Sequence, residues 1–303
     1  MMLLLLVLLT SVAPIQEAIE AEEAEWVAVE NKFTGMEDKS EYVLAEKPSN
    51  PSVLDIALYA PEQPALEVSF DWHNLGGEDW MTPVRDQGGC GSCWAFGTLG
   101  AVEAAYNISV NDPDYDLDLS EQYVISCMPG GCSGSIVEPI MQRMTVTGVP
   151  PESCMPYVGK ETPCLGMCDS YEADLVSIAA WRWVLPPLAG GEEGVKYFLT
   201  YGPIVSSMEI YEDFWAYESG VYEHVYGGSE GFHVVVIVGW DDATECWIAK
   251  NSWGEDWGED GYFRIKRGEA GLGLYGVQPY VKEEDVPEID YFKNAGCSCG
   301  FVY

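Results

Sequence analysis

Hydrophobic positions are spaced as in helices in the first half of the folded region and as in strands in the second. Leu99, Val102 and Tyr106 fall on one stripe of a helix predicted over 94–106. Another helix is expected to begin at 120–122, Ser-Glu-Gln. The first half is therefore predicted to be mainly helical.

The second half carries runs that are typical of strands. Residues 234–238, Val-Val-Val-Ile-Val, are rich in β-branched side chains, as in a buried strand. Residues 246–249 and 262–265 are predicted to form two further strands, with glycine-rich turns between them. A helical part followed by a β part indicates an α+β fold.

The two ends of the chain differ from the region between them. Residues 2–9 form an apolar run that is too short to span a bilayer but suits a secretory signal, so 1–20 are assigned to a signal peptide whose end is left open. Residues 21–66 are acidic and loosely patterned, which indicates a linker or a short pro-segment. The folded domain is placed at 67–282, and an acidic tail at 283–303.

Charge and cysteine content narrow the partners and the compartment. The 303 residues carry 50 acidic and 14 basic side chains, a formal net charge of −36. Nucleic acid and anionic membranes both require a basic face, so neither is expected as a partner. No other apolar run has transmembrane length, and the mature protein is expected to be a soluble monomer. Ten cysteines behind such an N-terminus predict disulfides and a secreted protein, either extracellular or in a lytic compartment.

Four side chains suggest nucleophilic catalysis by a thiol. A cysteine attacks as the thiolate, which a helix N-terminus and a nearby imidazolium both stabilise. Cys93 stands where the helical pattern begins, and His233 stands at the start of the predicted buried strand. Asn251 could orient the imidazole, and the side-chain amide of Gln87 could donate to an oxyanion. This chemistry needs no cofactor.

Two other uses of Cys90 and Cys93 are open at this point. A Cys-x-x-Cys pair at a helix start also occurs in redox proteins. A zinc site is the second alternative, but Cys127 and Cys132 do not supply another pair with metal-ligand spacing.

The segments around these positions resemble the papain-like cysteine peptidase family. Residues 87–96, QGGCGSCWAF, match the family's active-site signature. The spacing from Cys93 to His233 and Asn251 also fits the family. Three further segments match in the same order, at 119–122, 261–265 and 273–275. The resemblance covers roughly residues 67–282.

The resemblance implies a fold and a role for each residue. The fold would have two lobes, one mainly helical and one an antiparallel β-barrel-like lobe, with substrate extended in the cleft between them. Cys93 would be the nucleophile, His233 the general acid and base, and Asn251 the residue that orients His233. The Gln87 side chain and the Cys93 backbone N–H would form the oxyanion hole, and Trp253 would shield the Asn251–His233 bond. The expected reaction is hydrolysis of polypeptide substrates through a thioester on Cys93.

The resemblance also accounts for most of the cysteines. It implies disulfides between Cys90 and Cys132 and between Cys127 and Cys164, while a third bond could join Cys154 and Cys168, which lie near each other in sequence. The cysteines that remain are Cys246, Cys297 and Cys299, an odd number.

Some positions depart from the family pattern. Gly134 and Ser135 stand where relatives often have two glycines that face the substrate, so Ser135 would narrow the cleft. Phe232 stands where a smaller or polar residue is usual and could crowd His233. Val277 falls in the wall of the second subsite and favours apolar side chains there. These departures motivate an alternative, a catalytically impaired relative that acts as a binding module.

The segment before the domain departs as well. No arginine occurs before Arg85, so the arginine-containing motif of the long helical inhibitory pro-domain found in many relatives is absent. Any pro-segment is expected to be short and of another kind.

Overall fold

The computed structural model describes residues 12–43, 65–115, 117–184 and 191–285. The α-helices in these ranges are α2 (Ala13–Ala21), α3 (Cys93–Val110), α4 (Glu121–Cys127), α5 (Glu138–Val146) and α7 (Glu192–Leu199). The strands are β1 (Trp26–Ala28), β2 (Ser69–Asp71), β3 (Ala180–Val184), β4 (Ile204–Tyr211), β5 (Tyr217–Tyr222), β6 (Ser229–Asp241), β7 (Cys246–Lys250), β8 (Tyr262–Lys266) and β9 (Gly276–Tyr280).

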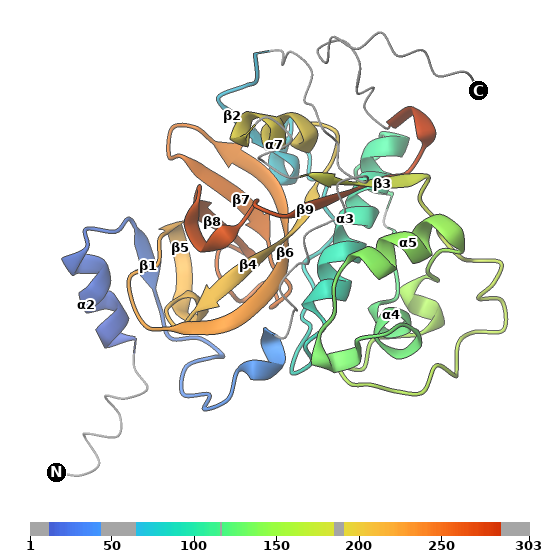
Figure 1. The fold of residues 1–303 in the computed structure, drawn as a ribbon, viewed down its shortest axis with the longest axis horizontal. Coiled ribbons are helices and arrows are strands. Elements are labelled where there is room, and N and C mark those ends of the chain that lie inside the picture. Colours follow the sequence, from blue (N-terminus) through green and yellow to red (C-terminus); the bar gives the residue numbers. More distant parts are fainter. Residues whose placement is uncertain (1–11, 44–64, 116, 185–190, 286–303) are drawn as a thin grey trace, which may run out of the picture.

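The predicted α+β fold is confirmed. Helices α3, α4 and α5 lie together on one side of the molecule, the helical lobe, and most of the sheet forms the other side, the sheet lobe (Figure 1). The two predicted helices correspond to α3 and α4, and the three predicted strands correspond to β6, β7 and β8.

The sheet differs in one respect from the antiparallel barrel that the resemblance implies. Its strand order is β1-β5-β8-β7-β6-β4-β9-β3, with β2 paired to β6, and the path does not close on itself. Strands β5 and β8 run parallel, whereas the other pairs are antiparallel. The sheet lobe is therefore an open mixed sheet.

Helix α3 connects the two lobes. It is 18 residues long and most of its residues are buried, so the single apolar stripe predicted from the sequence understates its packing. Strand β6 passes close to the helix at Gly97, where a Cβ atom would lie only 2.8 Å from a methyl carbon of Val234. A glycine in the first turns of α3 thus lets β6 approach the start of the helix.

Residues 12–43, the N-terminal segment, pack along the free edge of the sheet. Strand β1 pairs antiparallel with β5, and the side chain of Gln16 in α2 donates to the carbonyl of Ala28. Gly220 of β5 has a positive φ of 97°, and a Cβ there would lie 2.4 Å from the Glu25 carbonyl oxygen. Trp26 is buried, and its ring centroid lies 5.1 Å from that of Tyr222. The segment is therefore folded against the sheet lobe.

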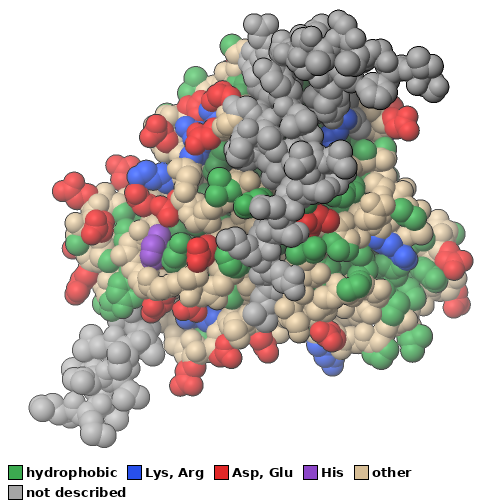
Figure 2. Space-filling model, in the orientation of Figure 1, with side chains coloured by type: hydrophobic (Ala, Val, Ile, Leu, Met, Phe, Trp, Pro, Cys, Tyr) green, Lys and Arg blue, Asp and Glu red, His purple; other side chains and the backbone are tan. Residues whose placement is uncertain are grey.

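Parts of the predicted organisation fall outside the described residues. They include the apolar run at 2–9, the stretch 44–64 and the tail beyond 285. The predicted end of the signal at residue 20 lies within helix α2, and that boundary stays a prediction. No helix in the described ranges is both long and apolar enough to span a bilayer. The acidic side chains are spread over the visible face of the molecule and are not gathered in one patch (Figure 2).

Candidate active site

Cys93 is the first residue of helix α3 and is completely buried. The loop before it is braced by the Cys90–Cys132 disulfide and by a hydrogen bond from the Gly91 N–H to the Cys132 carbonyl at 3.0 Å. Because the first N–H groups of a helix are unpaired, this position favours negative charge on the sulfur. Because Cys90 is bonded to Cys132, it does not form a redox-active disulfide with Cys93 in this structure.

His233 lies in β6, and Asn251 follows β7. Nε2 of His233 is 2.7 Å from Oδ1 of Asn251, and the same oxygen accepts the backbone N–H of Ser252 at 2.8 Å. Because Oδ1 is an acceptor from a backbone N–H, His233 must donate through Nε2. The lone pair of the neutral imidazole then resides on Nδ1, which has no hydrogen-bond partner among the described residues. A free ring nitrogen is what a general base requires.

The amide of Gln87 is held in one orientation by a residue that the sequence reasoning missed. Ser252 donates its hydroxyl to Oε1 of Gln87 at 2.7 Å, so Nε2 points the other way. That nitrogen donates to the Cys90 carbonyl at 3.0 Å and to the Tyr42 carbonyl at 3.2 Å. Ser252 directly follows Asn251 in the sequence, and this position was the only feature of the sequence that could have indicated its role.

The carbonyl of Tyr42 brings the N-terminal segment into the site. It accepts from the amide predicted for the oxyanion hole, and it also lies near the imidazole of His233. Nearby, Phe33 packs against Trp253 with ring centroids 5.1 Å apart. Nothing in the sequence pattern of 21–66 pointed to this contact.

Burial disfavours the charged forms of both reacting groups. The pKa of the Cys93 thiol is raised to about 12, chiefly because burial disfavours the thiolate. The pKa of His233 is lowered to about 4, again chiefly because of burial, although the bond to Asn251 and the Tyr42 carbonyl favour the protonated ring. The predicted thiolate–imidazolium pair is therefore disfavoured in this buried arrangement.

The ring of Trp253 packs against the imidazole of His233, which is the position expected for a residue that excludes water from it. Its ring centroid is 4.6 Å from that of His233, and it stacks on Trp215 at 4.6 Å. Only 1% of its surface is exposed. Trp253 is thus both a core residue and a cover over the His233 ring.

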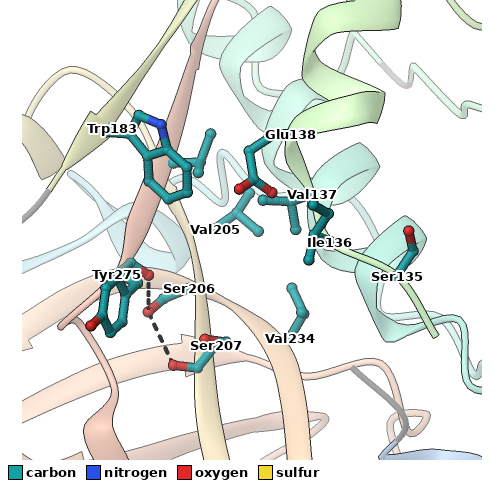
Figure 3. A pocket seen from close by; sticks show the side chains of 11 residues that line it. Ser135, Ile136, Val137, Glu138, Trp183, Val205, Ser206, Ser207, Val234 and Tyr275 are labelled. Atoms are coloured by element: carbon teal, nitrogen blue, oxygen red, sulfur yellow. Dashed lines mark hydrogen bonds between the residues drawn. The ribbon is translucent and has the colours of Figure 1, made fainter. Parts of the chain in front are cut away.

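The predicted subsite residues Ser135 and Val277 line one pocket, together with residues from both lobes (Figure 3). Val277 is buried in β9 and pairs with Val205 of β4. The Ser135 hydroxyl donates to the Pro129 carbonyl at 3.2 Å. Gly134 precedes Ser135 with a positive φ of 91°. The pocket is present beside Ser135.

Phe232 leaves the geometry of His233 intact. Neighbouring residues of a strand point to opposite faces, so in β6 the Phe232 side chain is directed away from the face that carries the imidazole. Crowding of the imidazole by Phe232 is not what the strand geometry supports.

Six of the other cysteines form disulfides. The structure contains disulfides at the three predicted pairs, Cys90–Cys132, Cys127–Cys164 and Cys154–Cys168. Cys246 is buried and unpaired, and Cys297 and Cys299 lie outside the described residues. Across the described ranges, no group of three or more His, Cys, Asp or Glu residues is placed to hold a metal ion.

A buried charged cluster behind the site was also missed. Lys250 donates to the Thr82 carbonyl at 2.6 Å, and the Thr82 hydroxyl donates to Glu103 at 2.7 Å. Burial raises the pKa of Glu103 and lowers that of Lys250, and the attraction between the two groups opposes both shifts. The cluster joins α3 to the end of β7, directly before Asn251.

Fold and site together define a two-lobed protein with a cysteine, a histidine and an asparagine brought in from separate elements. The chain belongs to the papain family of cysteine proteases, whose family model matches residues 66–281.

Curated relatives and solved structures agree with this assignment. Cathepsin B-like CP3 of Giardia intestinalis is 41% identical over 199 residues, which are 61% of this chain and 64% of the relative. Thiol protease aleurain of Arabidopsis thaliana is 34% identical, over 69% of this chain and 58% of the relative. The chain thus spans less than two thirds of the length of either relative.

Two solved precursors share the fold. Digestive procathepsin L2 from Tenebrio molitor larval midgut superimposes with a TM-score of 0.75 at 27% identity, over 88% of both chains. ProCathepsin B S9 from Trypanosoma congolense gives the same TM-score and identity, over 88% of this chain and 97% of that one.

Proposed function

We propose that this protein is a cysteine endopeptidase made as a zymogen, with the N-terminal segment as its inhibitor. The observation that carries the proposal is a hydrogen bond: the Gln87 side-chain amide donates to the Tyr42 carbonyl at 3.2 Å. A backbone carbonyl of a polypeptide already occupies the donor that a scissile carbonyl would need. The same site then serves for inhibition by the segment and for cleavage of other chains.

The mechanism follows from the geometry once the segment leaves. Water reaches the site, the penalty of burial falls, and the proton of Cys93 can pass to Nδ1 of His233. The thiolate attacks the scissile carbonyl carbon, and the oxyanion accepts from the Gln87 side chain and the Cys93 N–H. His233 then protonates the leaving amine, which departs and leaves a thioester on Cys93.

The second half of the cycle restores the enzyme. Neutral His233 takes a proton from water, the hydroxide attacks the thioester carbonyl, and Cys93 leaves as the thiolate. Asn251 holds the ring throughout, because its Oδ1 stays bound to Nε2–H. Trp253 keeps water away from that bond.

The arrangement of the N-terminal residues supports a secreted precursor. Helix α2 packs on β1 and belongs to the same folded segment, so the proposed pro-segment would include α2, and the end of the signal stays a prediction. The destination would be the extracellular space or a lytic compartment, and the substrates would be polypeptides. A monomer is expected.

Labelling with a thiol-trapping epoxide tests the proposal. The processed enzyme is expected to bind one equivalent at Cys93 and to cleave casein, whereas Cys93→Ala should lose both properties. Cys246→Ala removes the other unpaired buried thiol of the described residues and is expected to keep both. Cleavage by Cys93→Ala would overturn the proposal. Labelling of Cys93 without turnover on a broad peptide library would favour the binding module instead.

A further inference from the structure

The pocket that contains Ser135 and Val277 is apolar on nearly every side. Its walls include Val205 and Val234 from the sheet lobe and Ile136 and Val137 from the helical lobe. The free space, including the open mouth, is about 350 Å³. The apolar walls of this pocket suit an aliphatic side chain.

Among the described residues that line this pocket, Glu138 is the one that carries a charge. It is the first residue of helix α5, and its carboxylate lies between Trp183 and Ile136 and is turned towards the pocket interior (Figure 3). The side chain is half-buried. In the part of the chain that the structure describes, no lysine, arginine or histidine forms an ion pair with Glu138.

A structural role accounts for only part of this placement. An acidic residue in the first turn of a helix is favourable, and the backbone N–H groups of Val137 and Glu138 do stabilise the carboxylate. That benefit would be obtained equally by a carboxylate turned to solvent. Here desolvation outweighs it, and the pKa of Glu138 is raised. The described residues therefore place this carboxylate among valines and a tryptophan and give it no cationic partner.

We propose that Glu138 makes this pocket prefer a substrate residue with a long aliphatic stem and a positively charged end, lysine or arginine. The stem would cover Val205, Val234 and Val277, and the head group would reach the carboxylate. This inference rests on the proposed peptidase function, and it sharpens the expectation of purely apolar side chains at Val277. The strong negative charge of the whole chain would also draw basic substrates towards the cleft.

Matched fluorogenic peptides test the proposal. They differ only at the second residue before the scissile bond, which is norleucine, lysine or arginine, and all have glutamine at the first. Wild-type enzyme is expected to cleave the lysine and arginine peptides with at least the kcat/KM of the norleucine peptide. In Glu138→Gln the ratio of basic to norleucine kcat/KM should fall roughly tenfold, as a charged hydrogen bond is replaced by a neutral one.

A second variant separates the pocket from overall charge. Glu172→Gln removes the same charge from an exposed position and should leave the ratio unchanged. An unchanged ratio in Glu138→Gln, or an equal fall in both variants, would overturn the inference. Failure of the proposed function is distinguishable, because it would show as absent or Cys93-independent turnover on the norleucine peptide.

Discussion

The loop before the nucleophile and the N-terminal segment meet at the Gln87–Tyr42 hydrogen bond but are held in different ways. The loop is fixed by the Cys90–Cys132 disulfide and by the hydrogen bond that the Ser252 hydroxyl donates to the Gln87 side chain. Tyr157 adds a hydrogen bond to the Gln87 carbonyl at 2.6 Å. The segment is held by a three-residue strand, by packing of aromatic rings and by Lys32, which pairs with Asp86 at 2.7 Å.

The difference shows how one site can be both assembled and switched off. The oxyanion donor and the nucleophile are positioned by a covalent bond and buried hydrogen bonds that remain when the segment leaves. The segment uses packing and edge-strand pairing, which proteolysis can release without disturbing the loop. Three predictions test this contrast, from the largest expected effect to the smallest.

Removing the brace is expected to cost most. Cys90→Ala together with Cys132→Ala opens a loop with a sequence separation of 42, and should lower the free energy of unfolding by about 4 kcal/mol. The kcat/KM per folded molecule should also fall at least tenfold, because the loop carries the Gln87 amide and the start of α3. Denaturant titration and active-site titration measure the two effects.

The control is the disulfide that does not touch the loop. Loss of Cys154–Cys168, with a separation of 14, should cost about 3 kcal/mol and leave the activity per folded molecule unchanged. If both double variants lost activity equally, the brace would have no special role.

Loosening the segment should activate the precursor without harming the mature enzyme. Trp26→Ala removes a buried ring from the β1–β5 contact and should weaken the segment's hold by about 3 kcal/mol. Epoxide labelling of Cys93 in the unprocessed precursor, followed by intact mass, should then be more than tenfold faster. Val27→Ala is the matched control, because Val27 is 51% exposed on the same strand. Equal labelling of the two variants would contradict the role assigned to β1.

The free energy of unfolding should also fall as the pH rises towards neutrality. Glu152 accepts the backbone N–H of Tyr157 at 2.6 Å, and burial raises its pKa from 4.5 to about 7. Between these values the folded protein keeps a proton that the unfolded chain has lost, so this stabilising contribution is present at low pH and disappears as the pH passes 7. Relative to Glu152→Gln, wild type should lose stability in thermal melts between pH 5 and 8. Parallel curves for the two proteins would rule this out.

Much of the catalytic site could be predicted from the sequence because its signals are local. Cys93 directly precedes a helical pattern, His233 precedes a β-branched run, and Asn251 sits in a short family motif. Strands β6, β7 and β8 were likewise visible as apolar runs. The short strands β1 and β2 carry three residues each, too few for a periodic signal.

Other features depend on contacts between distant residues and could not be predicted. The cover over the site joins Tyr42 to Gln87, and the orientation of the amide depends on Ser252. The burial that disfavours charge on Cys93 and His233 arises only when distant parts of the chain pack together. Glu138 has no distinguishing neighbours in sequence, and only the packing of α5 against Trp183 turns it into the pocket.

The sequence by itself therefore determined the identity of the reacting groups, because thiol, imidazole and amide chemistry is fixed by residue type and local context. Only the tertiary structure decided the state of those groups and what surrounds them. The solvation of Cys93, its pairing with His233 and the access of substrate all depend on which distant surfaces come together. These three properties determine whether Cys93 is a thiolate or a buried thiol.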